Sequence, residues 1–144
     1  IFEKSGNKNC IYRINDNFLS FWFRFIFKHA DLIELKRFDV LADFLRRDYE
    51  TFSGFALEGY FRQKFVEAKR YTKIGSWWDR NGENEIDFLA ENELTGDFAV
   101  AAVKRQAGKI DRAVIESKLA AFRRATGEWK NCTPQFLTLS LEDM

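Results

Sequence analysis

Glu85-Ile86-Asp87-Phe88-Leu89-Ala90 and, after a short turn, Ala102-Val103-Lys104-Arg105-Gln106 are the stretches that decide the fold of this 144-residue chain. Both have the apolar content and spacing of β-strands that are buried on at least one face. If the two strands pair, Asp87 and Lys104 are expected to converge at one end of the sheet. The pair is therefore the first candidate for a functional site.

Side chains alternate across a strand, and this alternation predicts which residues share a face. Glu85, Asp87 and Leu89 are expected on one face of the first strand, with Ile86, Phe88 and Ala90 on the other. On the second strand, Ala102 is expected on the same face as Lys104.

An aspartate and a lysine at this spacing are typical of metal-dependent phosphodiester hydrolysis. That reaction needs a hard cation held by oxygen ligands, and a lysine positions the nucleophile or offsets charge on the phosphate. The second carboxylate of such a site is expected two residues before the lysine, where this chain has Ala102. A methyl group cannot bind a cation, so the pattern predicts an impaired site.

Composition excludes several classes of protein. The 46% apolar and 31% charged content indicates one globular domain, and the formal charge of +1 gives no global attraction to nucleic acid or membranes. Cys10 and Cys132 are too isolated for a zinc site. The most apolar run, Phe18 to Phe27, is too short to span a bilayer and contains Arg24. We expect a cytoplasmic protein without membrane association, and a helix-end or surface role for His29.

The remaining pattern predicts the element order α-β-β-β-α-β, that is, an α/β fold with a mixed sheet flanked by helices. An aromatic-rich helical extension precedes this core. Residues 1–14 suggest the end of a hairpin, Asp16 or Asn17 can cap the first helix, and the helical pattern at 36–69 is expected to break near Arg47 to Thr51 or at Gly54. The expected helices cover 17–29, 36–69 and 111–125, and the expected strands cover 71–78, 85–91, 98–105 and 135–139. Asp111 is expected to open the last helix, with Ile115 on its inner stripe and Gly127 beyond its end.

Glu58 is a third candidate site residue. It lies on the edge of the apolar stripe that Leu57, Phe61 and Phe65 form on the predicted helix. A carboxylate near an apolar face needs a partner such as a lysine or a metal ion. A solvated Glu58 at the edge of the stripe is the equally weighted alternative.

Four basic residues lie close to the predicted site, namely Lys104, Arg105, Lys109 and Arg112. Such a cluster could hold a phosphate backbone without reading sequence. The alternative is an ordinary charged surface, balanced by Asp111 and Glu116. Trp77 and Trp78 are expected on opposite faces of their strand, with one of them in the core.

Four stretches carry a resemblance to a known family. They are Tyr12-Arg-Ile-Asn-Asp-Asn-Phe-Leu-Ser-Phe-Trp-Phe-Arg-Phe25, Ile74-Gly-Ser-Trp-Trp-Asp79, Glu85-Ile-Asp-Phe-Leu-Ala90 and Val103-Lys-Arg105. The chain resembles the C-terminal domain of a family of archaeal and bacterial AAA-type ATPases of unknown function. The order and spacing are also similar to the restriction-endonuclease-like superfamily, with its Asp on one strand and Glu-x-Lys on the next.

The resemblance implies an upstream ATPase and an upstream winged-helix segment in the same chain, with residues 1–14 as the remnant of the latter. Residues 15–48 would then be the helical extension and residues 49–144 the nuclease-like core. It also implies Asp87 as principal metal ligand, Lys104 as catalytic lysine and Glu58 as helix acid. Magnesium would be the cofactor. Glu85 shares a strand face with Asp87 and is a further candidate ligand, and a solvated acid at the strand end is the favoured alternative.

Three functions remain open from the sequence. We expect first a regulatory or nucleic-acid-binding module with a nuclease-like fold, an impaired metal site and DNA as its candidate ligand, serving an ATPase activity that lies outside this sequence. The second is an active Mg-dependent DNA or RNA nuclease. The third is a protein-interaction domain whose Phe18–Phe27 helix docks on the ATPase.

Overall fold

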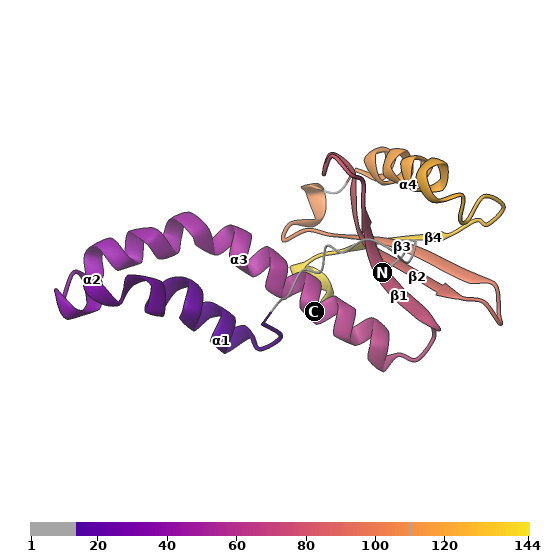
Figure 1. Cartoon of the computed structure of the whole chain (residues 1–144). Coiled ribbons are helices and arrows are strands. Elements are labelled where there is room, and N and C mark those ends of the chain that lie inside the picture. Colours follow the sequence, from indigo (N-terminus) through magenta and orange to yellow (C-terminus); the bar gives the residue numbers. More distant parts are fainter. Residues whose placement is uncertain (1–13, 110) are drawn as a thin grey trace.

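The computed structural model describes residues 14–109 and 111–144, and combines a helical hairpin with a sheet packed between two helices (Figure 1). The predicted hairpin at 1–14 lies outside these residues except for Ile14, and Cys10 lies outside them too. In chain order the elements are α1 (Asn17–Phe21), the π-helix η1 (Trp22–Ile26), the 3₁₀ helix η2 (Phe27–His29), α2 (Ala30–Glu34), α3 (Phe38–Glu67), β1 (Lys73–Trp78), β2 (Glu85–Asn92), β3 (Asp97–Val103), the 3₁₀ helix η3 (Ala107–Lys109), α4 (Arg112–Thr126), β4 (Gln135–Leu139) and the 3₁₀ helix η4 (Leu141–Asp143).

The sheet has the order β1-β2-β3-β4 and is mixed, as predicted. β1, β2 and β3 are antiparallel neighbours, while β4 pairs parallel to β3 after the crossover through α4. The molecule is thus a mixed α/β protein. No helix in the described ranges is long and apolar enough to cross a membrane.

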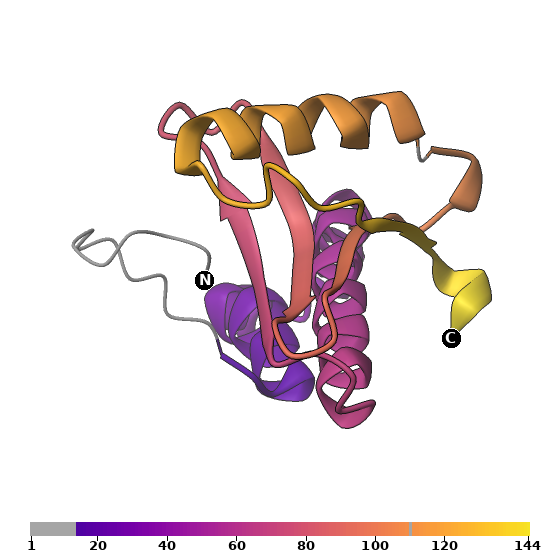
Figure 2. The ribbon, with the colours of Figure 1, turned by 90° about the vertical axis from the view of Figure 1, so that its right-hand side faces the viewer.

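The two faces of the sheet are covered by different helices (Figures 1 and 2). On one face, Ile115, Leu119 and Phe122 of α4 pack with Leu89 and Val100 of the sheet. On the other face, the C-terminal half of α3 packs its own apolar stripe against β2 and β3, through Leu57, Phe61, Phe88, Ala101 and Val103. Trp77 is buried in the α4 core and Trp78 is half-buried, which confirms that one of the two tryptophans belongs to the core.

The N-terminal half of α3 lies beyond the sheet and forms a second, aromatic core with the helices before it (Figure 1). Phe25 of η1 is 1% exposed, and its ring and that of Phe21 lie edge-on to Phe52 of α3. His29 ends η2 and stacks on Phe44 at 4.4 Å between ring centroids. His29 therefore has the helix-end position expected of it.

The predicted break in the second helix is wrong. α3 is one helix of 30 residues that runs through Arg47, Thr51 and Gly54, and also through residue 48, where the resemblance placed the end of the extension. Packing explains the continuity, because Phe52 joins the first half of the helix to the aromatic core and Leu57 and Phe61 anchor the second half on the sheet. Tertiary burial of this kind outweighs the roughly 1 kcal/mol helix penalty of a glycine.

A β-bulge in β2 corrects the predicted alternation of side chains. Gly75 of β1 pairs with Leu89, but Trp77 pairs with Ile86, so two residues of β2 oppose one of β1. Ile86 and Leu89 consequently lie in the same core under α4, although strict alternation places them on opposite faces. The two residues of the bulge are Asp87 and Phe88.

Local signals fix the ends of several elements where the sequence placed them. Asp16 caps α1 by accepting a hydrogen bond from the Leu19 N–H at 2.8 Å, and Asp111 caps α4 through the Ala113 N–H at 2.9 Å. Gly127 ends α4 with a φ of 77°, which an L-residue adopts only with strain.

Candidate active site

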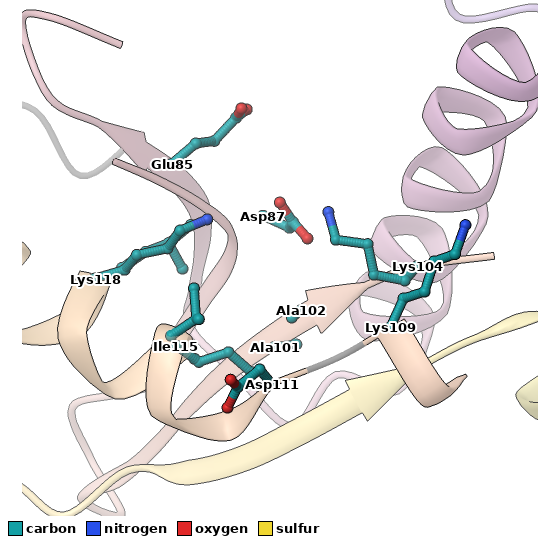
Figure 3. A pocket seen from close by; sticks show the side chains of 11 residues that line it. Glu85, Asp87, Ala101, Ala102, Lys104, Lys109, Asp111, Ile115 and Lys118 are labelled. Carbon is teal, nitrogen blue, oxygen red and sulfur yellow. The ribbon is translucent and has the colours of Figure 1, made fainter. Parts of the chain in front are cut away.

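A small cavity lies where β2 begins, β3 ends and α4 starts (Figure 3). Its volume is about 100 Å³. The position follows from the topology, because β2 is antiparallel to β3 and so begins at the end of the sheet where β3 finishes. The cavity is lined by Glu85, Ile86, Asp87, Ala101, Ala102, Lys104, Lys109, Asp111, Val114, Ile115 and Lys118.

Asp87 reaches this cavity from the bulge in β2 and is half-buried. Its Oδ2 accepts a hydrogen bond from the Val103 N–H at 2.8 Å. The bond joins β2 to the last residue of β3 beyond the regular ladder, which runs only from Phe88–Ala101 onward. Asp87 therefore holds the end of β3, in addition to any chemical role.

Lys104 is the first residue after β3, and its backbone N–H continues the pairing to β4 by donating to the Leu139 carbonyl at 3.0 Å. Its side chain is exposed and projects toward the same space as Asp87 (Figure 3). No hydrogen bond or ion pair joins the two side chains in the described part of the chain. The structure thus brings Asp87 and Lys104 to one cavity, and leaves the ammonium group available to a ligand.

Ala102 lies in the cavity wall on the α4 side of β3, half-buried against the core. The methyl group stands on the same wall as Lys104, where the second carboxylate of a metal site was expected. Ala102, where the sequence predicts that a carboxylate is missing, therefore lines the cavity.

Glu85 lines the cavity at its open rim and is exposed, whereas Glu58 does not line it. Glu58 belongs to α3, and its neighbours Leu57 and Phe61 pack on the opposite face of the sheet. The roles predicted for Glu85 and Glu58 as metal ligands, and for Glu58 as helix acid, stay predictions.

Three charged residues of the cavity, Lys109, Asp111 and Lys118, are not among the predicted metal or catalytic residues. Asp111 and Lys118 of the α4 region had no predicted role in the site, and Lys109 was considered only as part of the basic cluster. Asp111, Ile115 and Lys118 are spaced at i, i+4 and i+7, so they form one stripe of the helix. Because the sequence places Ile115 on the inner face of the helix, the same stripe indicates that Asp111 and Lys118 face the sheet as well.

The predicted basic cluster is divided by the structure. Lys104 and Lys109 line the cavity, while Arg105 lies against the ring of Tyr49, 5.9 Å from its centroid. Arg112 points elsewhere, with Nε 3.0 Å from the Glu116 carboxylate and its guanidinium over Phe136. The nucleic-acid-binding roles of the four residues stay predictions.

The carboxylates around the cavity are partly engaged by the backbone and share the space with lysines. Among the described residues no group of three His, Cys, Asp or Glu side chains is arranged to hold an ion. One oxygen each of Asp87 and Asp111 already accepts a backbone N–H. Three lysines line the same small space, and their charge opposes that of a cation.

A separate polar cluster lies near the far end of β2 and has a structural character. Glu91 is 6% exposed, accepts a hydrogen bond from the Trp129 indole and pairs with Lys73 at 3.1 Å. A buried carboxylate needs such partners. Nearby, burial raises the pKa of the Cys132 thiol, so this cysteine stays protonated at neutral pH and is a poor nucleophile.

Comparison with known proteins gives a family but no activity. A family model, DUF234, described as archaea bacterial proteins of unknown function, matches residues 22–118. An uncharacterized protein of Methanocaldococcus jannaschii is 36% identical over 100 residues, covering 65% of this chain. The chain spans only about a fifth of that relative, with 22% of its length matched. No solved structure matches the chain significantly.

Proposed function

The chain belongs to this family of archaeal and bacterial proteins of unknown function, and we propose that it is a nucleic-acid-binding module with a restriction-endonuclease-like fold and an impaired metal site. It would serve an ATPase in the same longer protein. The match to 22% of the archaeal relative is consistent with a module of that kind.

The fold part of the proposal rests on the order and pairing of the strands. Three antiparallel strands, a crossover helix and a parallel fourth strand follow α3, which is the α-β-β-β-α-β order expected of a restriction-endonuclease-like core. The candidate residues Asp87 and Lys104 lie at one end of that sheet, where β2 begins and β3 finishes. Fold alone does not decide activity, which depends on the residues of the cavity.

Ala102 is the observation that carries the functional part. A magnesium ion prefers six oxygen ligands in octahedral geometry, supplied by carboxylates, waters and substrate phosphate. Here the wall between Asp87 and Lys104 offers a methyl group. The remaining carboxylates do not replace the missing ligand, since Asp111 caps α4 and Glu85 lies exposed at the rim. The donor set therefore does not suit a resident magnesium ion.

The same cavity suits a phosphate group. Lys104, Lys109 and Lys118 surround a volume of about 100 Å³, and the first turn of α4 forms one wall. The space is large enough for a small polyatomic anion such as a phosphate group. Lysines give affinity for a nucleic-acid backbone without reading its sequence.

Titration of fluorescently labelled DNA with the whole chain tests this proposal, once in EDTA and once in Mn²⁺. Binding is expected to be independent of the metal. Lys104→Ala with Lys118→Ala should weaken binding and reduce the slope of log affinity against log salt by roughly 0.7–0.9 for each phosphate that the variant no longer neutralises. Lys28→Ala, a change of an exposed lysine in the helical extension, is the matched control.

Ala102→Glu is the complementary variant, because it restores the missing carboxylate. Calorimetry should detect Mn²⁺ binding to this variant and none to the natural sequence. If the natural sequence cleaves DNA or RNA in Mn²⁺ and Lys104→Ala abolishes cleavage, the second function, an active nuclease, replaces the one proposed.

Exposed aromatic residues favour the third function, a protein-interaction domain. Phe18 is 68% exposed and Phe27 is 63% exposed, both on the helical extension. Such a surface could dock on the ATPase part of the longer protein. In that case Phe18→Asp with Phe27→Asp abolishes binding of an ATPase fragment added in trans, while no nucleic acid binds.

A further inference from the structure

A second hollow lies beside the cavity, between the N-terminal half of α3 and the segment that follows β3. It is open to solvent and has a volume of about 430 Å³. It is lined by Leu45, Arg46, Tyr49, Glu50 and Arg105.

The hollow and the Lys104 cavity are neighbours. Lys104 lines the first and the next residue, Arg105, lines the second. Lys109 lines the first, and its Nζ lies 3.9 Å from the Glu50 carboxylate in the second. A ligand that fills both would therefore pass from one to the other across the start of the β3–α4 connection.

The chemistry of the hollow differs from that of the cavity. Tyr49 is 48% exposed, and the Arg105 guanidinium lies 5.9 Å from the centre of its ring. A flat aromatic ring, a flat guanidinium group and the apolar Leu45 side chain offer stacking surfaces for a planar, uncharged group. Nucleic-acid bases stack on such surfaces whatever their sequence, because every base has a π face.

A base can enter such a hollow only when it is unpaired, because a duplex buries the faces of its bases in the stack. Each nucleotide carries an anionic phosphate and a flat base. The lysine-lined cavity suits the phosphate, and the Tyr49–Arg105 hollow suits the base. The cavity has room for a phosphate group, and the hollow has room for a base.

We propose that the Tyr49–Arg105 hollow receives one unpaired base of a single-stranded nucleic acid whose adjoining phosphate lies in the Lys104 cavity. This inference rests on the proposed function and narrows its ligand to single strands. The shared chemistry, a phosphodiester next to an exposed base, occurs in both DNA and RNA.

Fluorescence anisotropy with four labelled probes and the whole chain tests the inference. The probes are oligo(dT), oligo(U), a blunt DNA duplex and an abasic strand of the same length, which keeps the phosphates but lacks the bases. Oligo(dT) or oligo(U) is expected to bind more tightly than the duplex and the abasic strand. The tighter of the two identifies the natural source as DNA or RNA.

Variants assign the effect to the hollow. Tyr49→Ala should weaken single-strand binding roughly 5- to 150-fold, the range for removal of one base–aromatic stack, and leave duplex binding unchanged. Tyr49→Phe keeps the ring and should bind as the natural sequence does. Phe38→Ala, a change of another exposed aromatic residue of α3, is the matched control.

The outcomes separate this inference from the proposed function. If the abasic strand binds as tightly as oligo(dT) and oligo(U), or if Tyr49→Ala leaves single-strand binding unchanged, the inference is overturned while phosphate binding stands. If Lys104→Ala with Lys118→Ala also leaves all binding unchanged, the proposed function fails as well.

Discussion

Replacing Asp87 separates its structural contact from its chemistry. Its Oδ2 accepts the Val103 N–H at 2.8 Å, and Val103 is only 4% exposed. Asp87→Ala leaves this N–H without its acceptor in a place that water reaches poorly. A buried group deprived of its partner costs about 1–3 kcal/mol, so we expect a loss near the middle of that range.

Asp87→Asn keeps an oxygen acceptor but removes the charge. Hydrogen bonds to charged groups contribute about 1.5–3 kcal/mol and neutral ones about 0.5–1.5 kcal/mol, so this variant should lose about 1 kcal/mol. The expected order of stability is natural sequence, then Asp87→Asn, then Asp87→Ala. In melting temperature the alanine variant should fall by about 4–8 °C, since 1 kcal/mol corresponds to about 2–4 °C in a chain of this size.

Urea unfolding followed by far-UV circular dichroism measures the differences in the free energy of unfolding. Glu85→Ala is the control, because Glu85 lines the same cavity but is exposed. Its change should stay within about 0.5 kcal/mol. If Asp87→Ala is no less stable than Glu85→Ala, Asp87 does not hold the end of β3. If the loss of stability is confirmed, weaker nucleic-acid binding by Asp87→Ala can reflect a displaced β3 end. The binding of Asp87→Ala must then be compared with that of Asp87→Asn.

Three further predictions concern the scaffold. Gly54→Ala should stabilise the chain by about 0.5–1 kcal/mol, because a Cβ there meets nothing within 4 Å. Gly127→Ala, at a φ of 77°, should destabilise it by about 1 kcal/mol. Urea unfolding measures both, and changes of the same sign in the free energy of unfolding contradict the backbone argument. Hydrogen bonds from the Asn84 amide and the nearby backbone lower the pKa of Asp79. The contribution of Asp79 to the free energy of unfolding is therefore present above the unfolded pKa of about 3.9 and is lost as the pH falls below it. Asn84→Ala should flatten the loss of stability on acidification, and an unchanged dependence of stability on pH refutes this. Leu57→Ala should cost about 2–5 kcal/mol because Leu57 is 4% exposed between α3 and the sheet, and a melting temperature within about 2 °C of the natural sequence, roughly 1 kcal/mol or less, would contradict that packing.

Local signals predicted most of the secondary structure. The caps at Asp16 and Asp111, the stop at Gly127 and the strand at 135–139 all have short-range causes, and the structure confirms them. The continuous α3 was missed for the opposite reason. A glycine and a charged stretch weaken a helix locally, but burial at two distant places along it decides the outcome.

The candidate site was predictable in part. Asp87 and Lys104 meet at one cavity because the alternation and turn length fixed the pairing of their strands. The bulge at Asp87 was not predictable, because it arises only when β2 is paired with β1. Lys118 shares a helix stripe with Ile115, which the sequence places on the inner face, but tertiary packing decides which end of the sheet this stripe meets.

The uninterrupted α3 has a mechanical consequence. At 1.5 Å per residue its 30 residues make a rod about 45 Å long, clamped by an aromatic core at one end and by the sheet at the other. With no hinge between the clamps, a tilt of about 10° imposed on the aromatic end swings the sheet end by roughly 8 Å, from the same rise per residue. A force on the helical hairpin would therefore move the sheet and its lysine-lined cavity as one rigid unit.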